Sequence, residues 1–159
     1  MRKLALCTAI MLACCAAVAS AEQARCLVEA FFVSPAVDQV IERQILAAID
    51  EAQESLFIAM YSFTDDELGQ AVIEAYTKRG LDVRILLDES QADGTGGKEW
   101  PKLRAAGIPI MVEDVTGLFH HKFAVIDGRL VITGSYNWSA SADEQNFENV
   151  VFIECEEIA

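Results

Sequence analysis

Hydrophobic and polar positions alternate with two different periods along the chain, and each period predicts a different element. Apolar runs over residues 26–34, 55–63 and 81–89 have the length and the β-branched and aromatic content of buried strands. Between these runs, apolar residues recur every three to four positions over 35–49 and 64–79, which predicts two amphipathic helices. Strands that alternate with helices in this way form parallel βαβ units, so the first half of the chain should be a sheet covered by helices.

Residues that favour helix ends flank the predicted helices. A Ser-Pro pair at 34–35 precedes the first helix, and Thr-Asp-Asp-Glu at 64–67 forms a capping box for the second, which should end at Gly80. A short helix over 98–106 and a strand over 108–113 follow, and the chain then shows no further helical pattern. We therefore predict an α/β fold with a mixed sheet, largely parallel with antiparallel C-terminal strands, flanked by helices.

The two histidines of the chain are adjacent, in a strand-like segment over residues 118–127. Side chains on a strand point alternately to opposite faces, so His120 and Lys122 should share one face while His121 points to the other. An Asp-Gly pair at 127–128 is typical of a two-residue hairpin turn, after which the chain should return antiparallel.

A two-residue turn fixes which residues face each other across this hairpin. It places His120 opposite Ser135 and brings Lys122 and Asn137 to the same face, whereas a different turn length would shift the register and undo the alignment. Gly134, which has no side chain, would let a ligand or another backbone approach closely. The hairpin is thus expected to gather four polar side chains into one cluster.

The chemistry of this cluster suits phosphoryl transfer. An imidazole, an ammonium, a hydroxyl and a carboxamide can together hold a tetrahedral anion and attack it. Each of the four could also be structural, as a packed histidine, a solvated strand lysine or a turn residue, but their convergence favours a functional site. A zinc site is the weaker interpretation, because the two histidine rings should face opposite sides and no cysteine or third histidine lies at ligand spacing.

The same residues resemble the HKD signature of the phospholipase D superfamily, in identity and in spacing. The matching positions are His120, Lys122, Asp127, Gly134, Ser135 and Asn137. The resemblance continues at residues 59–64, 105–110 and 146–153, and it is closest to the small periplasmic endonucleases of that superfamily, which carry one motif. Asp127 should lie in the turn and off the reactive face, so we assign it a structural role although it belongs to the motif.

The resemblance implies a metal-independent hydrolase of phosphodiester bonds that forms a phosphohistidine. One histidine attacks phosphorus and a second protonates the leaving oxygen; because only His120 lies on the reactive face, the second would come from another copy, in a homodimer with its active site on the two-fold axis. Lys122 and Asn137 would bind phosphate oxygens, with Ser135 assisting, and Glu148 would orient the histidine. No metal or other cofactor is expected, since lysines supply the positive charge.

The N-terminus has the pattern of a secretory signal. Two basic residues precede an apolar run and an Ala-Ser-Ala cleavage site, so we expect a signal peptide over residues 1–21, a single catalytic domain over 22–159 and a periplasmic or secreted protein. The apolar run is shorter than a membrane-spanning helix requires, and no transmembrane segment is expected in the mature chain. A lipoprotein cleavage box at 11–14 is a weaker alternative.

Two cysteines would remain after cleavage of the signal. Cys26 and Cys155 stand near opposite ends of the domain, and in an oxidising compartment they are expected to form a disulfide. Two unpaired buried thiols are the alternative.

Net charge complicates the choice of substrate. The chain has 12 Lys and Arg against 25 Asp and Glu, a net charge of −13, which repels nucleic acids and anionic membranes at long range. Local fields can still prevail, because charges more than about 8 Å apart are screened at physiological salt. Two groups of basic residues could line a substrate groove: Lys98, Lys102 and Arg104, or Lys78, Arg79 and Arg84.

Three functional hypotheses follow, in decreasing order of support. The first is an endonuclease that hydrolyses DNA or RNA, the second is a phospholipase D that acts on phospholipid headgroups, and the third is a non-catalytic binding protein with the same fold.

Overall fold

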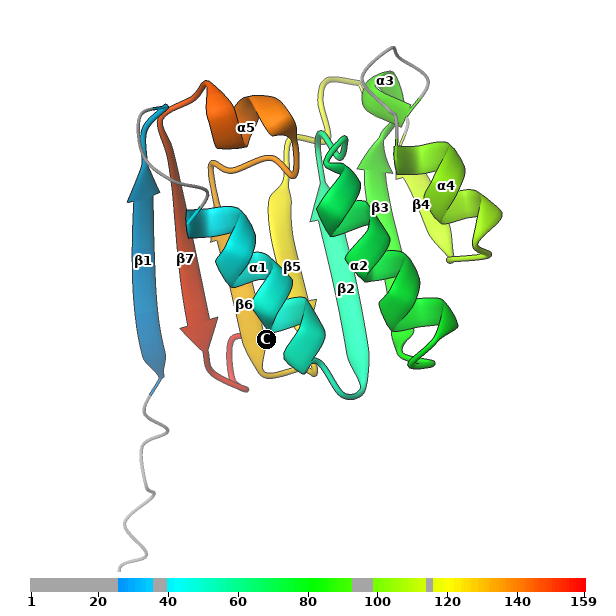
Figure 1. Cartoon of the computed structure of the whole chain (residues 1–159), viewed down its shortest axis with the longest axis horizontal. Coiled ribbons are helices and arrows are strands. Elements are labelled where there is room, and N and C mark those ends of the chain that lie inside the picture. The colour runs from blue at the N-terminus through cyan, green and yellow to red at the C-terminus, as the bar shows by residue number, and fades with distance from the viewer. Residues whose placement is uncertain (1–25, 36–39, 93–98, 114–115) are drawn as a thin grey trace, which may run out of the picture.

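A seven-stranded sheet with the strand order β1-β7-β6-β5-β2-β3-β4 forms the body of the molecule (Figure 1). The computed structural model describes residues 26–35, 40–92, 99–113 and 116–159; the expected signal peptide lies outside them. The strands are β1 (Leu27–Val33), β2 (Ser55–Met60), β3 (Asp82–Asp88), β4 (Ile110–Glu113), β5 (Lys122–Ile126), β6 (Leu130–Gly134) and β7 (Glu148–Glu154). The helices are α1 (Val40–Glu51), α2 (Asp66–Thr77), α3 (Glu89–Ala92), α4 (Glu99–Ala105) and α5 (Ala140–Glu144).

The mixed α/β class that the sequence predicts is confirmed. Parallel pairing is confined to β2, β3 and β4, whereas β5, β6, β7 and β1 pair antiparallel. Antiparallel pairs therefore outnumber parallel ones, in contrast to the largely parallel sheet that we expected. The difference arises because β5 pairs antiparallel with β2, and because β1 pairs with β7, a strand from the other end of the chain.

Helix α2 begins one residue later than the capping box suggests. Asp65, not Thr64, is the N-cap, and its carboxylate accepts a hydrogen bond from the backbone N–H of Leu68 at 2.9 Å. The chain leaves the helical conformation after Thr77. Gly80 has a φ of 73°, in the left-handed region that favours glycine.

The described helices α1, α2, α4 and α5 lie on one face of the sheet. Figure 1 shows α1, α2, α4 and α5 on the same side, as right-handed crossovers between parallel strands require for α2 and α4. The core lies between this face and the helices; its fully buried residues include Ile41, Ile45, Ile49, Leu56, Leu68, Val72 and Val83.

The opposite face of the sheet carries apolar side chains that no described helix covers. Phe32, Phe57 and Met111 point to this open face and have exposed fractions of 77%, 37% and 59%. A groove of about 480 Å³ runs over β2, β3, β4 and β5, and its lining includes Phe57, Arg84, Met111 and Phe123. No described helix is long and apolar enough to cross a bilayer.

A disulfide joins the two ends of the described chain. Cys26 precedes β1 and Cys155 follows β7, and their Cα atoms lie 4.7 Å apart. The bond spans 129 residues, a loop whose closure in the unfolded state is worth about 4–5 kcal/mol in the chain-entropy model. It therefore fixes an edge strand that pairs with β7 alone.

Candidate active site

The β5–β6 hairpin has a longer turn than the sequence predicted. Ile126 pairs with Leu130, so residues 127–129 form a three-residue loop, and Phe123 pairs with Thr133. The predicted register is therefore wrong by one residue, and the direct pairing of His120 with Ser135 that we derived from it does not hold.

Contacts from a distant part of the chain account for this turn. The carboxylate of Asp127 accepts hydrogen bonds from the backbone N–H groups of Gln53, Glu54 and Ser55 at 2.9, 2.8 and 2.9 Å. Burial alone would raise the pKa of Asp127, but these three donors hold it below its ordinary value. Asp127 thus lies in the turn, at the opposite end of β5 from His120, where it joins the hairpin to the connection before β2.

We call the end of the sheet at which β2 and β6 finish and β5 and β7 begin the motif end, and the opposite end the turn end. His120 lies exposed at the motif end, just before β5, with its ring against Tyr61 at a centroid distance of 4.5 Å. The ring of His121 instead contacts Phe119 and Phe123, at 4.8 and 5.8 Å. Because Phe123 belongs to the open face, the two histidines point in different directions.

Lys122 is half-buried beside His120. Its ammonium donates to the carbonyl oxygen of His120 at 3.2 Å and lies 5.0 Å from the centroid of the Tyr61 ring. Burial lowers the pKa of Lys122, while the nearby carboxylate of Glu148 acts in the opposite direction. The attraction places Lys122 and Glu148 on the same side of the sheet.

Ser135 and Glu148 form one unit. The Ser135 hydroxyl donates to Glu148 and accepts from the backbone N–H of Asn149 at 3.1 Å, and Asn146 donates to the second carboxylate oxygen at 3.0 Å. Among the described residues, no hydrogen bond joins Glu148 to His120. The structure thus shows Glu148 holding Ser135, and its orientation of the histidine stays a prediction.

Gly134 allows the close approach of β7 that gives this unit its geometry. Its φ is 155°, and a Cβ atom at this position would overlap the backbone oxygen of Asn149. The neighbouring Ser135 N–H donates to that same oxygen at 3.0 Å. The backbone that approaches the glycine is therefore that of β7.

Asn137 is fixed by the segment that follows β2. Its Oδ1 accepts from the Ser62 N–H at 3.3 Å, and the next carbonyl oxygen, that of Trp138, accepts from Thr64 and Asp65 at 2.8 and 3.0 Å. Since the amide oxygen is engaged, its NH₂ group remains the part of Asn137 that can donate to an anion. The loop over 135–139 is thus docked on residues 61–65.

Two residues of this site were missed in the sequence. Tyr61 contacts both His120 and Lys122, and Asp88 accepts from the Phe119 N–H at 2.6 Å, directly before the histidines. Both stand where β2 and β3 end at the same edge of the sheet, and this position is the signal that could have identified them.

Buried carboxyl groups lie behind the 135–139 loop. Glu42, Asp65 and Asp143 are each less than a tenth exposed, and the Tyr136 hydroxyl donates to Asp143 at 3.3 Å. Burial, together with repulsion from Asp65, Asp143 and Glu67, raises the pKa of Glu42 to about 7. Among the described residues, none of these three carboxyls forms an ion pair with a basic side chain.

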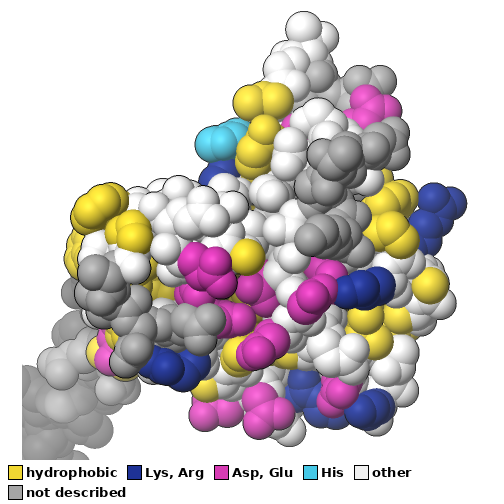
Figure 2. Space-filling model, turned by 45° about the horizontal axis from the view of Figure 1, so that its top comes forward, with side chains coloured by type: hydrophobic (Ala, Val, Ile, Leu, Met, Phe, Trp, Pro, Cys, Tyr) yellow, Lys and Arg dark blue, Asp and Glu magenta, His cyan; other side chains and the backbone are white. Residues whose placement is uncertain are grey.

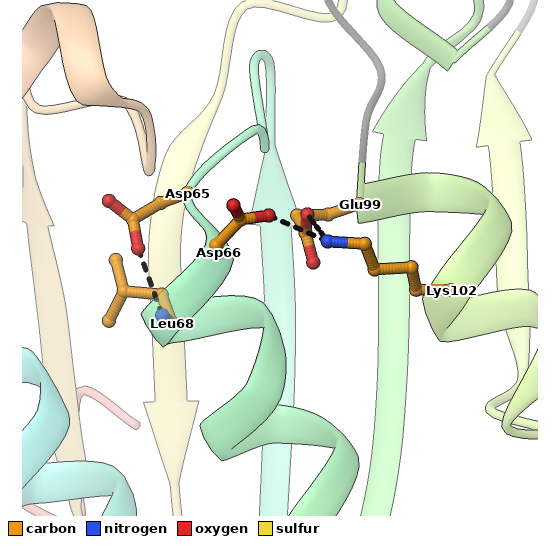
Figure 3. A network of polar contacts seen from close by, with 5 residues as sticks. All are labelled: Asp65, Asp66, Leu68, Glu99 and Lys102. Carbon is orange, nitrogen blue, oxygen red and sulfur yellow. Dashed lines mark hydrogen bonds and ion pairs between the residues drawn. The ribbon is translucent and has the colours of Figure 1, made fainter.

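A further buried carboxyl, that of Glu99, lies between α4 and α2. Figure 3 shows the Lys102 ammonium between Asp66 and Glu99, at 2.6 and 2.8 Å. The Oε2 of Glu99 is buried without a hydrogen-bond partner among the described atoms, and burial raises the pKa of this carboxyl. Gly69 of α2 makes room for it, because a Cβ atom there would overlap Oε2.

The basic residues proposed for a substrate groove do not gather at the motif end where the structure describes them, and Arg84 lines the groove on the open face instead. Arg79 donates to carbonyl oxygens at the C-terminal end of α1, including Ile49 at 2.8 Å, and Arg84 pairs with Asp82; both contacts lie toward the turn end. Lys78 pairs with Glu74, Lys102 is engaged as above, Arg104 lies over the ring of Trp100, and Lys98 is outside the described residues. In Figure 2, acidic side chains gather near the centre of the face, apart from the visible histidine, which lies next to a basic side chain.

A family model and several curated proteins match this chain. The family model described as "Cardiolipin synthase, PLD-like domain" matches residues 45–159. Phospholipase D of Rickettsia conorii is 41% identical over 111 residues, which are 70% of this chain and 54% of that protein. Mitochondrial cardiolipin hydrolase of Chlamydomonas reinhardtii is 38% identical over 110 residues, 69% of this chain and 48% of that protein. The chain thus spans about half the length of these curated relatives.

Two solved structures share the fold over most of their length. Nuc from Salmonella typhimurium, described as a phospholipase D family member, superposes with a TM-score of 0.76 and 29% identity, over 84% of this chain and 87% of that one. NucT from Helicobacter pylori gives a TM-score of 0.75 at 24% identity, over 84% and 89% of the two chains. With the family model matched over residues 45–159, the chain belongs to the phospholipase D-like family.

Proposed function

We propose that this chain hydrolyses phosphodiester bonds without a metal, by attack of His120 on phosphorus. The observation that carries the proposal is the convergence of His120, Lys122, Asn137 and the Ser135–Glu148 pair at one exposed end of the sheet. In the first step a nitrogen–phosphorus bond forms and the bond to the leaving oxygen breaks. Water then attacks phosphorus and releases the imidazole.

The fixed polar groups have distinct roles in this scheme. The Lys122 ammonium and the NH₂ group of Asn137 donate to the non-bridging phosphate oxygens, where negative charge accumulates in the transition state. Both groups are held before substrate arrives, Lys122 by Tyr61 and Asn137 by Ser62. Glu148 keeps the ammonium charged and holds Ser135, and it orients the imidazole once the site is assembled.

A second copy of the chain supplies the general acid in this proposal. The open face of the sheet offers an apolar surface for it, with Phe32, Phe57 and Met111 exposed. Sheets that pack face to face lie about 10 Å apart. If the two-fold axis runs along the strands, such packing brings the two motif ends side by side. Because His120 points away from the open face, the two imidazoles would meet beyond the strand ends, on a phosphate bound at the rim shared by both copies.

Mixed dimers test this shared site. Co-expression of wild-type chain with an excess of His120→Ala chain should lower activity as the square of the wild-type fraction, because only dimers with two intact histidines turn over. Activity that falls in simple proportion to the wild-type fraction would show that each chain works alone. Sedimentation of the purified protein gives the oligomeric state independently.

Nucleic acid is the first candidate substrate. The fold match to Nuc and NucT covers more than four-fifths of each chain, whereas the match to the named phospholipases covers about half of theirs. His120 is exposed at the motif end, so an internal bond of a long polymer can reach it. We therefore propose an endonuclease acting on DNA or RNA.

Phospholipid is the second candidate substrate, supported by exposed apolar side chains near His120 and Glu148. Leu118 and Phe147, which are 58% and 82% exposed, stand close in sequence to His120 and Glu148. Apolar tips of this kind can enter the headgroup region of a bilayer. Most described Lys and Arg side chains are engaged elsewhere, which leaves few to neutralise the phosphates of a polyanion.

A single set of assays separates these candidates. Purified protein is incubated in chelator with plasmid DNA, with RNA and with phospholipid vesicles, and His120→Ala and His121→Gln are assayed beside it. We expect nicking of nucleic acid that His120→Ala abolishes and His121→Gln retains, with a phosphorylated imidazole detectable by mass spectrometry after acid-free quenching. Phosphatidic acid without nicking would select the second candidate, and no turnover of any substrate would contradict the enzymatic proposal.

A further inference from the structure

Tyr61 is in contact with both of the groups that the proposed reaction needs most. It directly follows β2 at the motif end, where β5 begins. Its ring lies 4.5 Å from the His120 ring between centroids, with an interplanar angle of 56°, and the Lys122 ammonium lies 5.0 Å from its centroid. Its backbone N–H also donates to the carbonyl oxygen of His121 at 2.7 Å. Tyr61 thus contacts the main chain of this segment, the His120 imidazole and the Lys122 ammonium.

Few other described contacts hold the His120 imidazole and the Lys122 ammonium in place. Within the described chain, the exposed His120 imidazole has no hydrogen bond to any side chain, and Tyr61 is its ring contact. The Lys122 ammonium has the carbonyl oxygen of His120 and the attraction of Glu148 besides the Tyr61 ring. The Tyr61 ring is therefore the surface against which both groups are placed.

We propose that Tyr61 is a positioning residue that holds the His120 imidazole and the Lys122 ammonium in the geometry required for attack on phosphorus. The inference rests on the proposed function and adds to it a residue outside the motif. The face of the ring attracts the ammonium, and its bulk restricts rotation of the adjacent imidazole. Pre-oriented groups accelerate a reaction more than they strengthen binding, so the effect belongs to the chemical step.

The hydroxyl of Tyr61 has a separate and smaller role. It accepts a hydrogen bond from the Gln91 side chain at 3.3 Å, and within the described residues no hydrogen bond joins it to His120 or Lys122. The ring, rather than the hydroxyl, is thus the operative part. A phenylalanine at this position should keep the positioning surface, whereas an aliphatic residue should lose it.

The test compares Tyr61→Leu with Tyr61→Phe in single-turnover reactions. We expect Tyr61→Leu to slow formation of the phosphohistidine about 10- to 100-fold with KM changed by less than about threefold, as for a nucleophile released from its attack geometry. Tyr61→Phe should restore most of that loss. Tyr76→Leu is the matched control, because Tyr76 is a half-buried tyrosine of α2 that packs on the core near Gly107, away from His120. It should leave the chemical step unchanged.

A second measurement makes the inference testable without turnover. In the free protein, NMR signals of the His120 imidazole should shift in Tyr61→Leu, because the ring current is lost, and stay close to wild type in Tyr61→Phe. If Tyr61→Leu does not fold, Tyr61→Met replaces it with similar bulk and no ring. Unchanged imidazole signals, or an unchanged chemical step in an active enzyme, would overturn the inference while leaving the proposed function standing. An inactive wild-type protein with shifted signals would refute the function alone.

Discussion

The two ends of the sheet hold their motif residues in different ways. At the turn end, Asp127 receives three backbone N–H donors, and Arg79 satisfies carbonyl oxygens at the end of α1. At the motif end, Glu42 lies buried among other carboxyls, and His120 is exposed with one ring contact. The motif residue at the turn end is thus fixed by backbone hydrogen bonds. The motif end, beside carboxylates with backbone donors such as Asp88, keeps groups whose charge and position can still change. This division is common where a scaffold supports a reactive site.

The largest expected effect is the loss of turnover when the nucleophile at the motif end, His120, is removed. His120→Ala should lower turnover by about 1,000-fold or more, because a covalent nucleophile is lost, while the thermal midpoint stays within about 2 °C of wild type because the side chain is exposed. Steady-state kinetics and a thermal melt are measured on the same sample. A large loss of stability would show that the motif end contributes to the scaffold as well.

The next effect is on stability, at the turn end. Asp127→Ala should lower the free energy of unfolding by about 1–3 kcal/mol, because three backbone N–H groups, of which that of Ser55 is partly buried, lose their acceptor. Denaturant titration measures the change, with Asp50→Ala, an exposed aspartate of α1, as the control.

Acid should reveal the same interaction in the wild type. The pKa of Asp127 is lower in the folded protein than its ordinary 3.8, so its contribution is complete above that pH. It should be lost as the pH falls through the folded pKa, and Asp127→Ala should lack this acid-dependent component. Parallel acid titrations of the two proteins would contradict the assignment.

A third substitution tests how the buried carboxyl of Glu99 packs against Gly69 of α2. Alanine usually stabilises a helix by about 1 kcal/mol relative to glycine, yet Gly69→Ala should destabilise by about 2 kcal/mol because its Cβ would overlap Glu99. In a Glu99→Ala background the overlap is gone, and the same substitution should become neutral or stabilising. Denaturant titration of the four proteins gives the coupling, and additive effects would refute the packing argument.

The smallest expected effect concerns Glu42. Its pKa rises from an ordinary 4.5 to about 7 on folding, so the folded state binds the extra proton and the free energy of unfolding should fall as the pH rises from 4.5 to about 7. Glu42→Gln should remove this slope and be more stable than wild type at pH 8 by about 1–2 kcal/mol. Glu51→Gln, an exposed glutamate of the same helix, should keep the slope. An unchanged slope in Glu42→Gln would place the proton elsewhere.

Local sequence patterns predicted the strands and helices that depend mainly on residues within the same segment. The apolar runs identified β1, β2 and β3, and the Thr-Asp-Asp-Glu box located α2 to within a residue. Helix α5 was missed because its five residues are too few to show a period. The motif residues could be selected because strand parity and a known spacing agree on them.

Features with distant causes could not be predicted in the same way. The hairpin register depends on hydrogen bonds between Asp127 and residues 53–55, which no local turn rule contains. The contact between Tyr61 and His120 likewise depends on β2 and β5 being neighbours, which the order of elements along the chain does not specify. The basic residues were grouped by position in the sequence, although their acidic partners decide where their charge is used.

The covalent link between Cys26 and Cys155 makes the described chain a closed ring. A protease that cuts one exposed connection would open this ring without releasing a fragment, because both pieces stay attached through sulfur. Under reducing conditions the same cut would yield two polypeptides held by packing alone. Survival of the fold after such a cut would then depend on the redox state of the surroundings.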